Sequence, residues 1–216
     1  MIKHTTILGI ETAIQGGSLS LLKGGLEIDF WIGEKNISKA EDVLEQISKI
    51  LKKNNLKKVD LIAVSTGPGS TTGLRIGLAT AYGLGKSWGC GIIGISVFEA
   101  VLLNKKFTKE LILAFPFGRS QVAWQVFEND TVPPNYQMAE IEFGSVEVFL
   151  ELLEGRNFTK IILHNFLKKI ISENSKNFKM SKIEILDDKF AKYIAAKGKA
   201  DKTQKDMRPI MIKSFY

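Results

Sequence analysis

Short apolar runs separated by glycine pairs occupy the start of the chain. The pairs Gly16–Gly17 and Gly24–Gly25 mark tight turns between three such runs, which predicts an antiparallel meander of three strands. Farther along, apolar runs alternate with segments whose apolar residues recur every three or four positions, the period of an amphipathic helix. The strands predicted for this half are 5–11, 18–22, 26–32, 59–66 and 91–96. The predicted helices are 38–54, 72–88 and 97–103.

Three strands followed by a helix, and then two strands that each lead into a helix, form the order of a ribonuclease-H-like (actin-like) unit. A capping box, Ser38-Lys39-Ala40-Glu41, supports the start of the first helix. The run 59–66 is apolar as a strand inside a parallel sheet would be. We therefore predict an α/β fold in which a mixed sheet carries helices.

A polar segment, 104–109, interrupts the pattern near the middle of the chain and predicts a domain boundary. The second half then repeats the order of strands and helices, without a residue-level repeat. Its predicted strands are 110–117, 121–127, 138–143, 160–164 and 182–186, and its predicted helices are 144–154, 164–174 and 188–199. We expect two ribonuclease-H-like domains, 1–104 and a smaller one at 105–216, whose last segment, 208–216, is a strand or an extended arm.

The composition is that of a folded protein from a reducing compartment. Of the 216 residues, 44% are apolar and 25% are charged, which suffices for real cores and argues against disorder. The single cysteine, Cys90, excludes an intramolecular disulfide framework, and neither a signal peptide nor a membrane-spanning run is visible. We expect a cytoplasmic protein. The net charge of +7 fits either an anionic partner or a solvated lysine-rich surface.

The glycine-rich segment 65–89, STGPGSTTGLRIGLATAYGLGKSWG, raises the question of a phosphate site. It lacks the lysine of a Walker loop, which neutralises the phosphates. Gly67, Gly69 and Gly73 are spaced two and four apart, which does not fit the dinucleotide fingerprint. The surroundings of Ser70 do not match a nucleophile elbow either.

The same segment can instead be a structural loop before a closely packed helix. Pro68 fixes one backbone angle, and one of the three hydroxyl residues after Gly69 caps the helix. Glycine inside a helix costs about 1 kcal/mol relative to alanine, so several on one face indicate that another backbone approaches closely. This small-residue stripe is Gly73, Gly77, Ala81 and Gly85. It faces either the domain's own sheet or a second protein chain. We favour the second chain, because Arg75, Thr80 and Tyr82 leave little of the helix facing solvent.

Three segments resemble the TsaB (YeaZ) family in order and spacing, and the likeness covers about residues 5–103. They are ILGIETA at 7–13, VDLIAVSTGPGSTTGLRIGLATAYGLG at 59–85 and GIIGISVFEAVL at 91–102. The motif Gly67-Pro68-Gly69-Ser70 is a specific part of this likeness. Glu11 stands where the family usually has Asp, and Thr71 where it usually has Phe. The chain is therefore similar to the family as a divergent member.

The resemblance implies two actin-like (ASKHA) domains and a noncatalytic subunit. TsaB proteins lack the metal-binding histidines of the catalytic protein TsaD and act as its partner. Together with the ATPase TsaE they make threonylcarbamoyladenosine at adenosine 37 of tRNAs that read ANN codons. The resemblance also implies a homodimer in isolation and an indirect relation to tRNA.

In the TsaB family, the helix after the glycine loop and the helix before it pair with TsaD or with another TsaB. The corresponding helices of this chain are 38–54 and 72–88. Together with the small-residue stripe, this likeness predicts a partner interface. Its predicted residues are Ala40, Val43, Leu44, Ile47, Thr72, Gly73, Leu74, Ile76, Gly77, Thr80, Ala81, Leu84 and Gly85.

An actin-like nucleotide-binding phosphotransferase or hydrolase is the alternative function. Glycine-rich turns can present N–H groups to anions without a lysine, and actin-like kinases use a carboxylate at the end of the first strand to hold magnesium. This alternative places ATP or ADP and Mg²⁺ at a subunit interface, although the chain has no cofactor of its own. The possible nucleotide-binding residues are Glu11, Ser18, Gly67, Gly69 and Ser70.

No complete catalytic set is visible in the sequence. His4 lies close to the chain start, His164 ends an apolar strand, and Asp187-Asp188 precedes a helix, so each has an ordinary structural explanation. No base lies near Ser70 or Cys90, which argues against a peptidase. We therefore predict no catalytic residue and no metal site.

Overall fold

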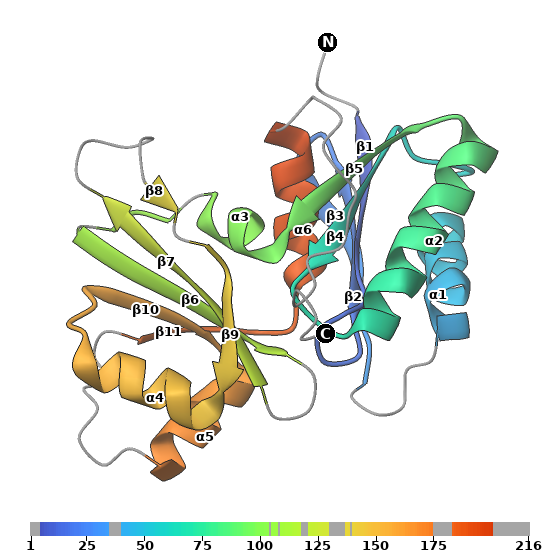
Figure 1. The fold of residues 1–216 in the computed structure, drawn as a ribbon. Helices are drawn as coiled ribbons and strands as arrows, with labels where there is room; N and C mark the ends of the chain where they lie inside the picture. The colour runs from blue at the N-terminus through green and yellow to red at the C-terminus, as the bar shows by residue number, and fades with distance from the viewer. Residues whose placement is uncertain are drawn as a thin grey trace. The chain divides into compact units, whose positions relative to one another are not determined.

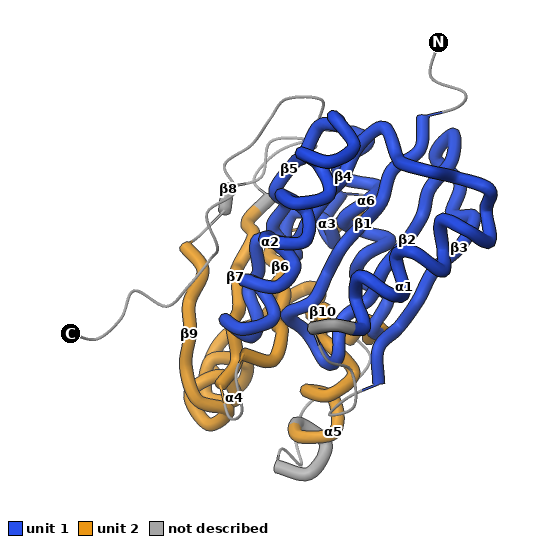
Figure 2. Tube along the Cα trace, turned by 90° about the vertical axis from the view of Figure 1, so that its right-hand side faces the viewer, with its two compact units in different colours: residues 1–103, 188–216 blue, residues 104–187 orange. Residues whose placement is uncertain are grey.

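The computed structural model describes most of the chain in eight stretches. They are 5–34, 40–103, 105–107, 109–117, 121–129, 137–138, 140–174 and 183–200. The chain divides into two compact units, residues 1–103 with 188–216 and residues 104–187 (Figure 2). Within the described stretches, no helix is long and apolar enough to cross a membrane.

The first unit is built on a five-stranded mixed sheet in the order β3-β2-β1-β4-β5 (Figure 1). Its strands are β1 (Thr6–Glu11), β2 (Ser18–Lys23), β3 (Leu26–Ile32), β4 (Leu61–Gly67) and β5 (Gly91–Ser96). The first three pair antiparallel, whereas β4 and β5 run parallel to β1. Gly24 and Gly25 form the turn between β2 and β3 with φ values of 62° and 93°, a region that favours glycine. The predicted meander is confirmed.

Helices cover both faces of this sheet. They are α1 (Ala40–Lys53), α2 (Thr71–Trp88), α3 (Val97–Leu102) and α6 (Phe190–Ala200). Successive residues of a strand point to opposite faces, and β1 uses this alternation fully. Leu8 and Ile10 join the core that α1 and α2 cover, whereas Gly9 lies against Ala191 and Ala195 of α6. Because both faces are covered, every residue of β1 is buried.

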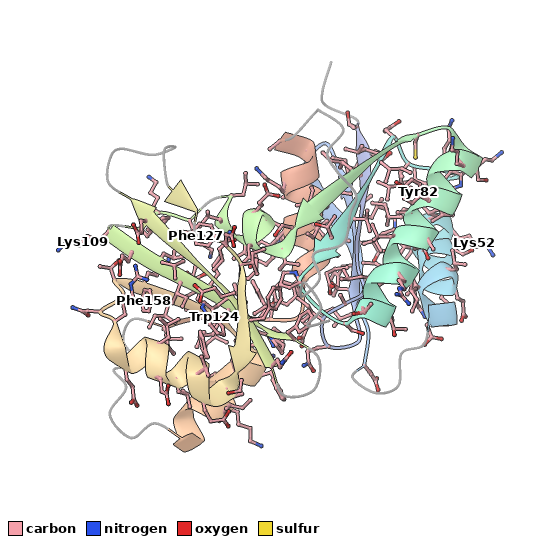
Figure 3. The ribbon with its side chains drawn as sticks, viewed as in Figure 1. Lys52, Tyr82, Lys109, Trp124, Phe127 and Phe158 are labelled. Carbon is pink, nitrogen blue, oxygen red and sulfur yellow. The ribbon has the colours of Figure 1, made fainter. Side chains whose placement is uncertain are left out.

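The second unit has a mixed sheet in the order β11-β10-β6-β7-β8, with β9 also paired to β7. Its strands are β6 (Lys109–Phe117), β7 (Gln121–Asn129), β8 (Gln137–Met138), β9 (Glu142–Ser145), β10 (Lys160–His164) and β11 (Ile183–Leu186). Its helices are α4 (Val146–Gly155) and α5 (Asn165–Asn174). The predicted strand 138–143 is therefore two short strands. Figure 3 shows Trp124 and Phe158 in the interior of this unit, where both are buried.

The two sheets share one topology. The path β9-β7-β6-β10-β11 of the second unit matches the path β3-β2-β1-β4-β5 of the first, with the same antiparallel and parallel pairings. Each unit also has a helix before its fourth strand and another before its fifth strand. The predicted fold class, two ribonuclease-H-like (actin-like) units, is confirmed.

The last helix departs from the predicted division into 1–104 and 105–216. The boundary near residue 104 is where the chain leaves the first unit, but α6 returns to that unit. Ser18 of β2 accepts a 3.0 Å hydrogen bond through its Oγ from the backbone N–H of Ala191. The prediction is therefore wrong for this helix, because an apolar helix face does not say which sheet it covers. Ser38 and the tail 208–216 lie outside the described residues.

Replacing Gly9 by alanine tests the packing of α6 on β1. A β-carbon on Gly9 would overlap the carbonyl oxygen of Ala191 and lie 2.9 Å from Cβ of Ala195. We expect Gly9→Ala to lower the free energy of unfolding by about 1–3 kcal/mol in urea titrations, as overpacking does. The matched control is Gly83→Ala in α2, where nothing lies within 4 Å of the added methyl group. Equal stability of the two variants would contradict this packing.

Candidate partner-binding surface and glycine loop

The glycine loop joins β4 to α2 and rests on the turn that follows β1. Gly67 has a φ of 104°, a value that favours glycine, and its peptide bond to Pro68 is cis. The N–H of Ser70 donates a 2.9 Å hydrogen bond to the carbonyl oxygen of Ala13. Its side-chain Oγ accepts a bond from the N–H of Gly73 and so caps α2. Ser70 is thus confirmed as one of the three predicted caps.

The N-terminal half of the small-residue stripe packs on the molecule's own first unit. A β-carbon on Gly73 would overlap the carbonyl oxygen of Thr12, and one on Gly77 would overlap the Thr12 hydroxyl. That hydroxyl donates a 2.7 Å hydrogen bond to the carbonyl oxygen of Gly73. These glycines therefore let the α2 backbone approach the turn after β1.

The C-terminal half of the stripe packs inward as well. Ala81 has no exposed surface, and a β-carbon on Gly85 would overlap the side chain of Ile92 in β5. Our prediction that a second chain packs against the stripe is wrong, because the domain's own strand and turn already occupy the space. Small residues on a helix indicate that another segment packs closely against it, and here that segment belongs to the same unit.

The other predicted interface residues that the structure describes range from buried to exposed. Val43, Ile47 and Leu74 are buried in the core beneath α1 and α2. Leu44 and Thr72 are exposed, and the remaining described members are half-buried. The half-buried ones are Ile76, Thr80 and Leu84. The side chain of Ala40 lies outside the described ones.

Both α1 and α2 carry small or apolar residues that are exposed. We call four of them the outer helix face: Leu44 of α1, and Ala79, Tyr82 and Gly83 of α2. Leu44 and Tyr82 are each 51% exposed, which is high for large apolar side chains, and nothing lies within 4 Å of a β-carbon on Gly83. Figure 3 labels Tyr82 on α2. Sequence reasoning predicted Leu44 as an interface residue but missed the other three, although Ala79 and Gly83 form a second pair of small residues four positions apart.

Glu11, at the end of β1, is a fully buried carboxyl group. Its Oε1 accepts hydrogen bonds from the N–H groups of Ala13 (2.6 Å) and Ile14 (3.1 Å), whereas its Oε2 has no partner among the described residues. Burial, with a smaller contribution from the nearby Asp188, raises the pKa of Glu11 to about 8 against the effect of these two bonds. The side chain is therefore mostly protonated at neutral pH. Its Oε1 holds the turn on which α2 packs.

The predicted nucleotide-binding residues gather at one end of the first sheet. Glu11 and Ser18 are cross-strand partners, and the glycine loop reaches the adjacent turn. Most of their polar groups are already engaged: Oε1 of Glu11 and Oγ of Ser18 accept hydrogen bonds from backbone N–H groups, and a β-carbon on Gly69 would lie 2.5 Å from Cβ of Ala13. This arrangement fits a bound phosphate poorly. A nucleotide at a subunit interface stays a prediction and would need ligands from a second chain.

The remaining candidate catalytic residues have structural environments. His164 is buried, and its Nδ1 accepts a 3.2 Å hydrogen bond from the N–H of Phe166 in the first turn of α5. Burial raises the pKa of the Cys90 thiol, which disfavours the reactive thiolate. His4 lies outside the described residues. Across the described stretches, no three His, Cys, Asp or Glu side chains gather as metal ligands would.

Known proteins share this fold. A family model described as "TsaD: tRNA N6-adenosine threonylcarbamoyltransferase" matches residues 37–183. YeaZ from Pseudomonas aeruginosa superposes with a TM-score of 0.64 at 16% identity, covering 91% of this chain and 92% of that one. A second structure, titled as an uncharacterized protein with similarity to peptidase YeaZ from the same organism, gives 0.67 at 14% identity, with 97% and 100% covered. The fold is therefore that of the actin-like proteins with two ribonuclease-H-like units.

Curated sequences identify the family within this class. The tRNA threonylcarbamoyladenosine biosynthesis protein TsaB of Buchnera aphidicola subsp. Schizaphis graminum is 30% identical over 188 residues, which are 82% of this chain and 86% of that protein. The protein of the same name from Buchnera aphidicola subsp. Baizongia pistaciae is 32% identical over 128 residues, 55% of this chain and 56% of that protein. The chain belongs to the TsaB (YeaZ) family.

Substituting glutamine for Glu11 tests the buried carboxyl group. The native state keeps a proton that the unfolded chain, with a pKa near 4.5, has lost, so this group lowers stability as the pH rises from 4.5 to about 8. One such proton corresponds to a loss of up to about 1.4 kcal/mol per pH unit. Glu11→Gln keeps the Oε1 acceptor and has no proton to lose.

We therefore expect the stability of Glu11→Gln relative to the wild-type protein to increase steadily between pH 5 and pH 8. Urea unfolding at each pH unit measures this difference. A difference that stays constant across the range would show that Glu11 is ionised in the folded protein.

Two leucine substitutions in α2 test which side of the helix is buried. Gly77→Leu would force a side chain into the Thr12 hydroxyl, and we expect it to destabilise the first unit by about 3 kcal/mol or more. Gly83→Leu adds a good helix former at an open position and should leave stability unchanged or raise it by up to about 1 kcal/mol. Thermal unfolding measures the melting temperatures of both variants. Equal melting temperatures would mean that the stripe is not packed on the turn.

Proposed function

We propose that this chain is the noncatalytic subunit that pairs with a TsaD-like catalytic protein in the biosynthesis of threonylcarbamoyladenosine in tRNA. Its relatives are named for this pathway, and the matching family model is named for the threonylcarbamoyltransferase itself. The observation that carries the pairing is the outer helix face. It combines two exposed large apolar side chains with an open glycine on neighbouring helices.

The outer helix face has the chemistry of a helix-packing surface. Exposed large apolar residues that cluster on adjacent elements mark interaction sites, and an aromatic residue such as Tyr82 is a common anchor in them. Ala79 and Gly83 present almost bare backbone beside that anchor, so a partner helix can approach closely. Exposed Arg75, four residues before Ala79, supplies part of the polar rim of such an interface.

The noncatalytic role is supported by the environments of the polar residues in the described stretches. Glu11 and Ser18 bond backbone groups, and His164 caps a helix. No base stands beside a nucleophile among the contacts of these residues, and catalysis would need such a set. The chemistry of the pathway is therefore assigned to the partner.

The wider assembly follows from the same proposal. A TsaE-like ATPase joins the pair, and in the absence of the catalytic partner a second copy of this chain pairs through the outer helix face. A tRNA substrate also favours the cytoplasm as the location of the complex.

Association with the TsaD-like protein of the same organism tests the proposal. We expect Leu44→Arg and Gly83→Leu each to weaken the complex by about 30-fold or more, because a central interface position contributes about 2 kcal/mol. Sedimentation velocity with the purified partner measures the dissociation constant, and the reconstituted pathway measures threonylcarbamoyladenosine formation.

Val148→Arg is the matched control, because Val148 is an exposed apolar residue of the second unit, 50% accessible and remote in sequence from α1 and α2. It should associate as the wild-type chain does. If both outer-face variants bound the partner as tightly as the wild-type chain does, the outer helix face would not be the interface. If the wild-type chain formed no complex, the proposed pairing would be wrong.

A further inference from the structure

The C-terminal ends of α1 and α2 carry a group of lysines that the proposed function does not use. The segment 48–58, SKILKKNNLKK, contains five lysines and no acidic residue. It covers the last turns of α1 and the loop that leads to β4. We call five of the lysines at this end the lysine patch. They are Lys52, Lys53, Lys57, Lys58 and Lys86.

Two contacts bring Lys86 of α2 to this end of the unit. The Nζ of Lys58 donates a 3.3 Å hydrogen bond to the carbonyl oxygen of Trp88, the last residue of α2. Leu56 and Trp88 also pack against the same core. The loop after α1 is therefore fixed beside the last turn of α2, where Lys86 is exposed.

Some lysines of the patch make contacts within the unit, and others do not. Lys53 pairs with Asp29 at 3.1 Å, Lys58 bonds Trp88, and lysines near helix C-termini interact favourably with the helix dipole. Lys52, Lys57 and Lys86 have no hydrogen bond or ion pair with any residue in the described stretches. Figure 3 shows Lys52 pointing away from α1. Three cations thus face solvent at one place.

Acidic groups near the patch offset part of its charge, because a carboxylate that accepts hydrogen bonds stays ionised. Asp60 accepts two 2.7 Å hydrogen bonds from the N–H and the hydroxyl of Thr6, which hold the pKa of its carboxyl group below the usual range. Glu45 pairs with Lys49, one turn before the patch. The positive charge of the patch is therefore only partly compensated by its own unit.

We propose that the lysine patch binds the phosphate backbone of the tRNA on which the complex acts. This inference rests on the proposed function, which supplies the tRNA, and it adds a direct contact by this chain. Flexible lysines contact phosphates as point charges and need no base-specific geometry. A tRNA held at the ends of α1 and α2 leaves the outer helix face, on the sides of the same helices, free for the partner protein.

RNA suits this surface better than an acidic protein does. Among the described residues, no exposed large apolar side chain lies within segment 48–58, so the lysines of that segment have no hydrophobic anchor; Tyr82, one turn before Lys86, belongs to the outer helix face. Stable protein interfaces are built around such anchors and are depleted in lysine. Phosphate backbones require charge alone, and each neutralised phosphate releases counterions.

Binding of tRNA by the isolated chain tests this inference. The patch variant is the triple substitution Lys52→Gln, Lys57→Gln, Lys86→Gln, which changes only the three lysines that have no partner within the described stretches. We expect it to weaken binding of fluorescently labelled tRNA about ten-fold or more at 100 mM KCl, measured by anisotropy. The slope of log K against log salt concentration should also fall by about two to three, as the loss of three phosphate contacts implies.

The matched control is the triple substitution Lys106→Gln, Lys109→Gln, Lys168→Gln in the second unit, which removes the same charge from exposed lysines. It should bind tRNA within about two-fold of the wild-type chain. Equal weakening by both triples, wild-type binding by the patch triple, or no tRNA binding by the wild-type chain would each overturn the inference.

The partner assay separates this inference from the proposed function. The patch triple should associate with the TsaD-like protein as the wild-type chain does and should unfold at the same temperature. If it lost the partner but kept tRNA, the patch would be a protein interface and the inference would be wrong. If instead the outer-face variants kept the partner, the proposed pairing would fail while the tRNA measurement stood.

Discussion

The close approach of the α2 backbone to the turn after β1 is the contact on which the first unit depends. Gly73 and Gly77 leave room for Thr12, whose hydroxyl bonds the backbone of α2. Glu11 stabilises this turn by accepting hydrogen bonds from the N–H groups of Ala13 and Ile14. This chain of contacts fixes which side of α2 is buried. It therefore also determines which residues remain for a partner.

The sequence was sufficient for the order of elements, the fold class and the structural nature of the glycine loop, because these depend on local periodicity and turn chemistry. The sequence was not sufficient to predict what the small-residue stripe packs against. Glycines at helical spacing reveal that another group comes close, but they do not say whether that group belongs to the same unit, as Ile92 does for Gly85, or to a second chain. The exposed pair Ala79 and Gly83 carried the same signal more weakly, since one of the two is alanine.

The last helix illustrates a second limit. The apolar face of α6 was visible in the sequence, but its position after the strands of the second unit suggested the wrong sheet. Only the contacts of Ala191 with Ser18 and Gly9 show where it belongs. The two units share a topology, yet α5, the counterpart of α2, follows β10 directly and contains no glycine. The surface features that we connect with assembly are therefore confined to the first unit.

The return of α6 to the first sheet has a consequence for biosynthesis. During translation, β1 to β5 leave the ribosome long before Phe190 to Ala200, so the part of the sheet that α6 covers stays exposed while the whole inserted unit is made. Such exposed apolar surface is the kind that chaperones recognise and that aggregates in its absence. The second unit, contiguous in the chain from 104 to 187, can close first, and the earlier-synthesised half reaches its native state last.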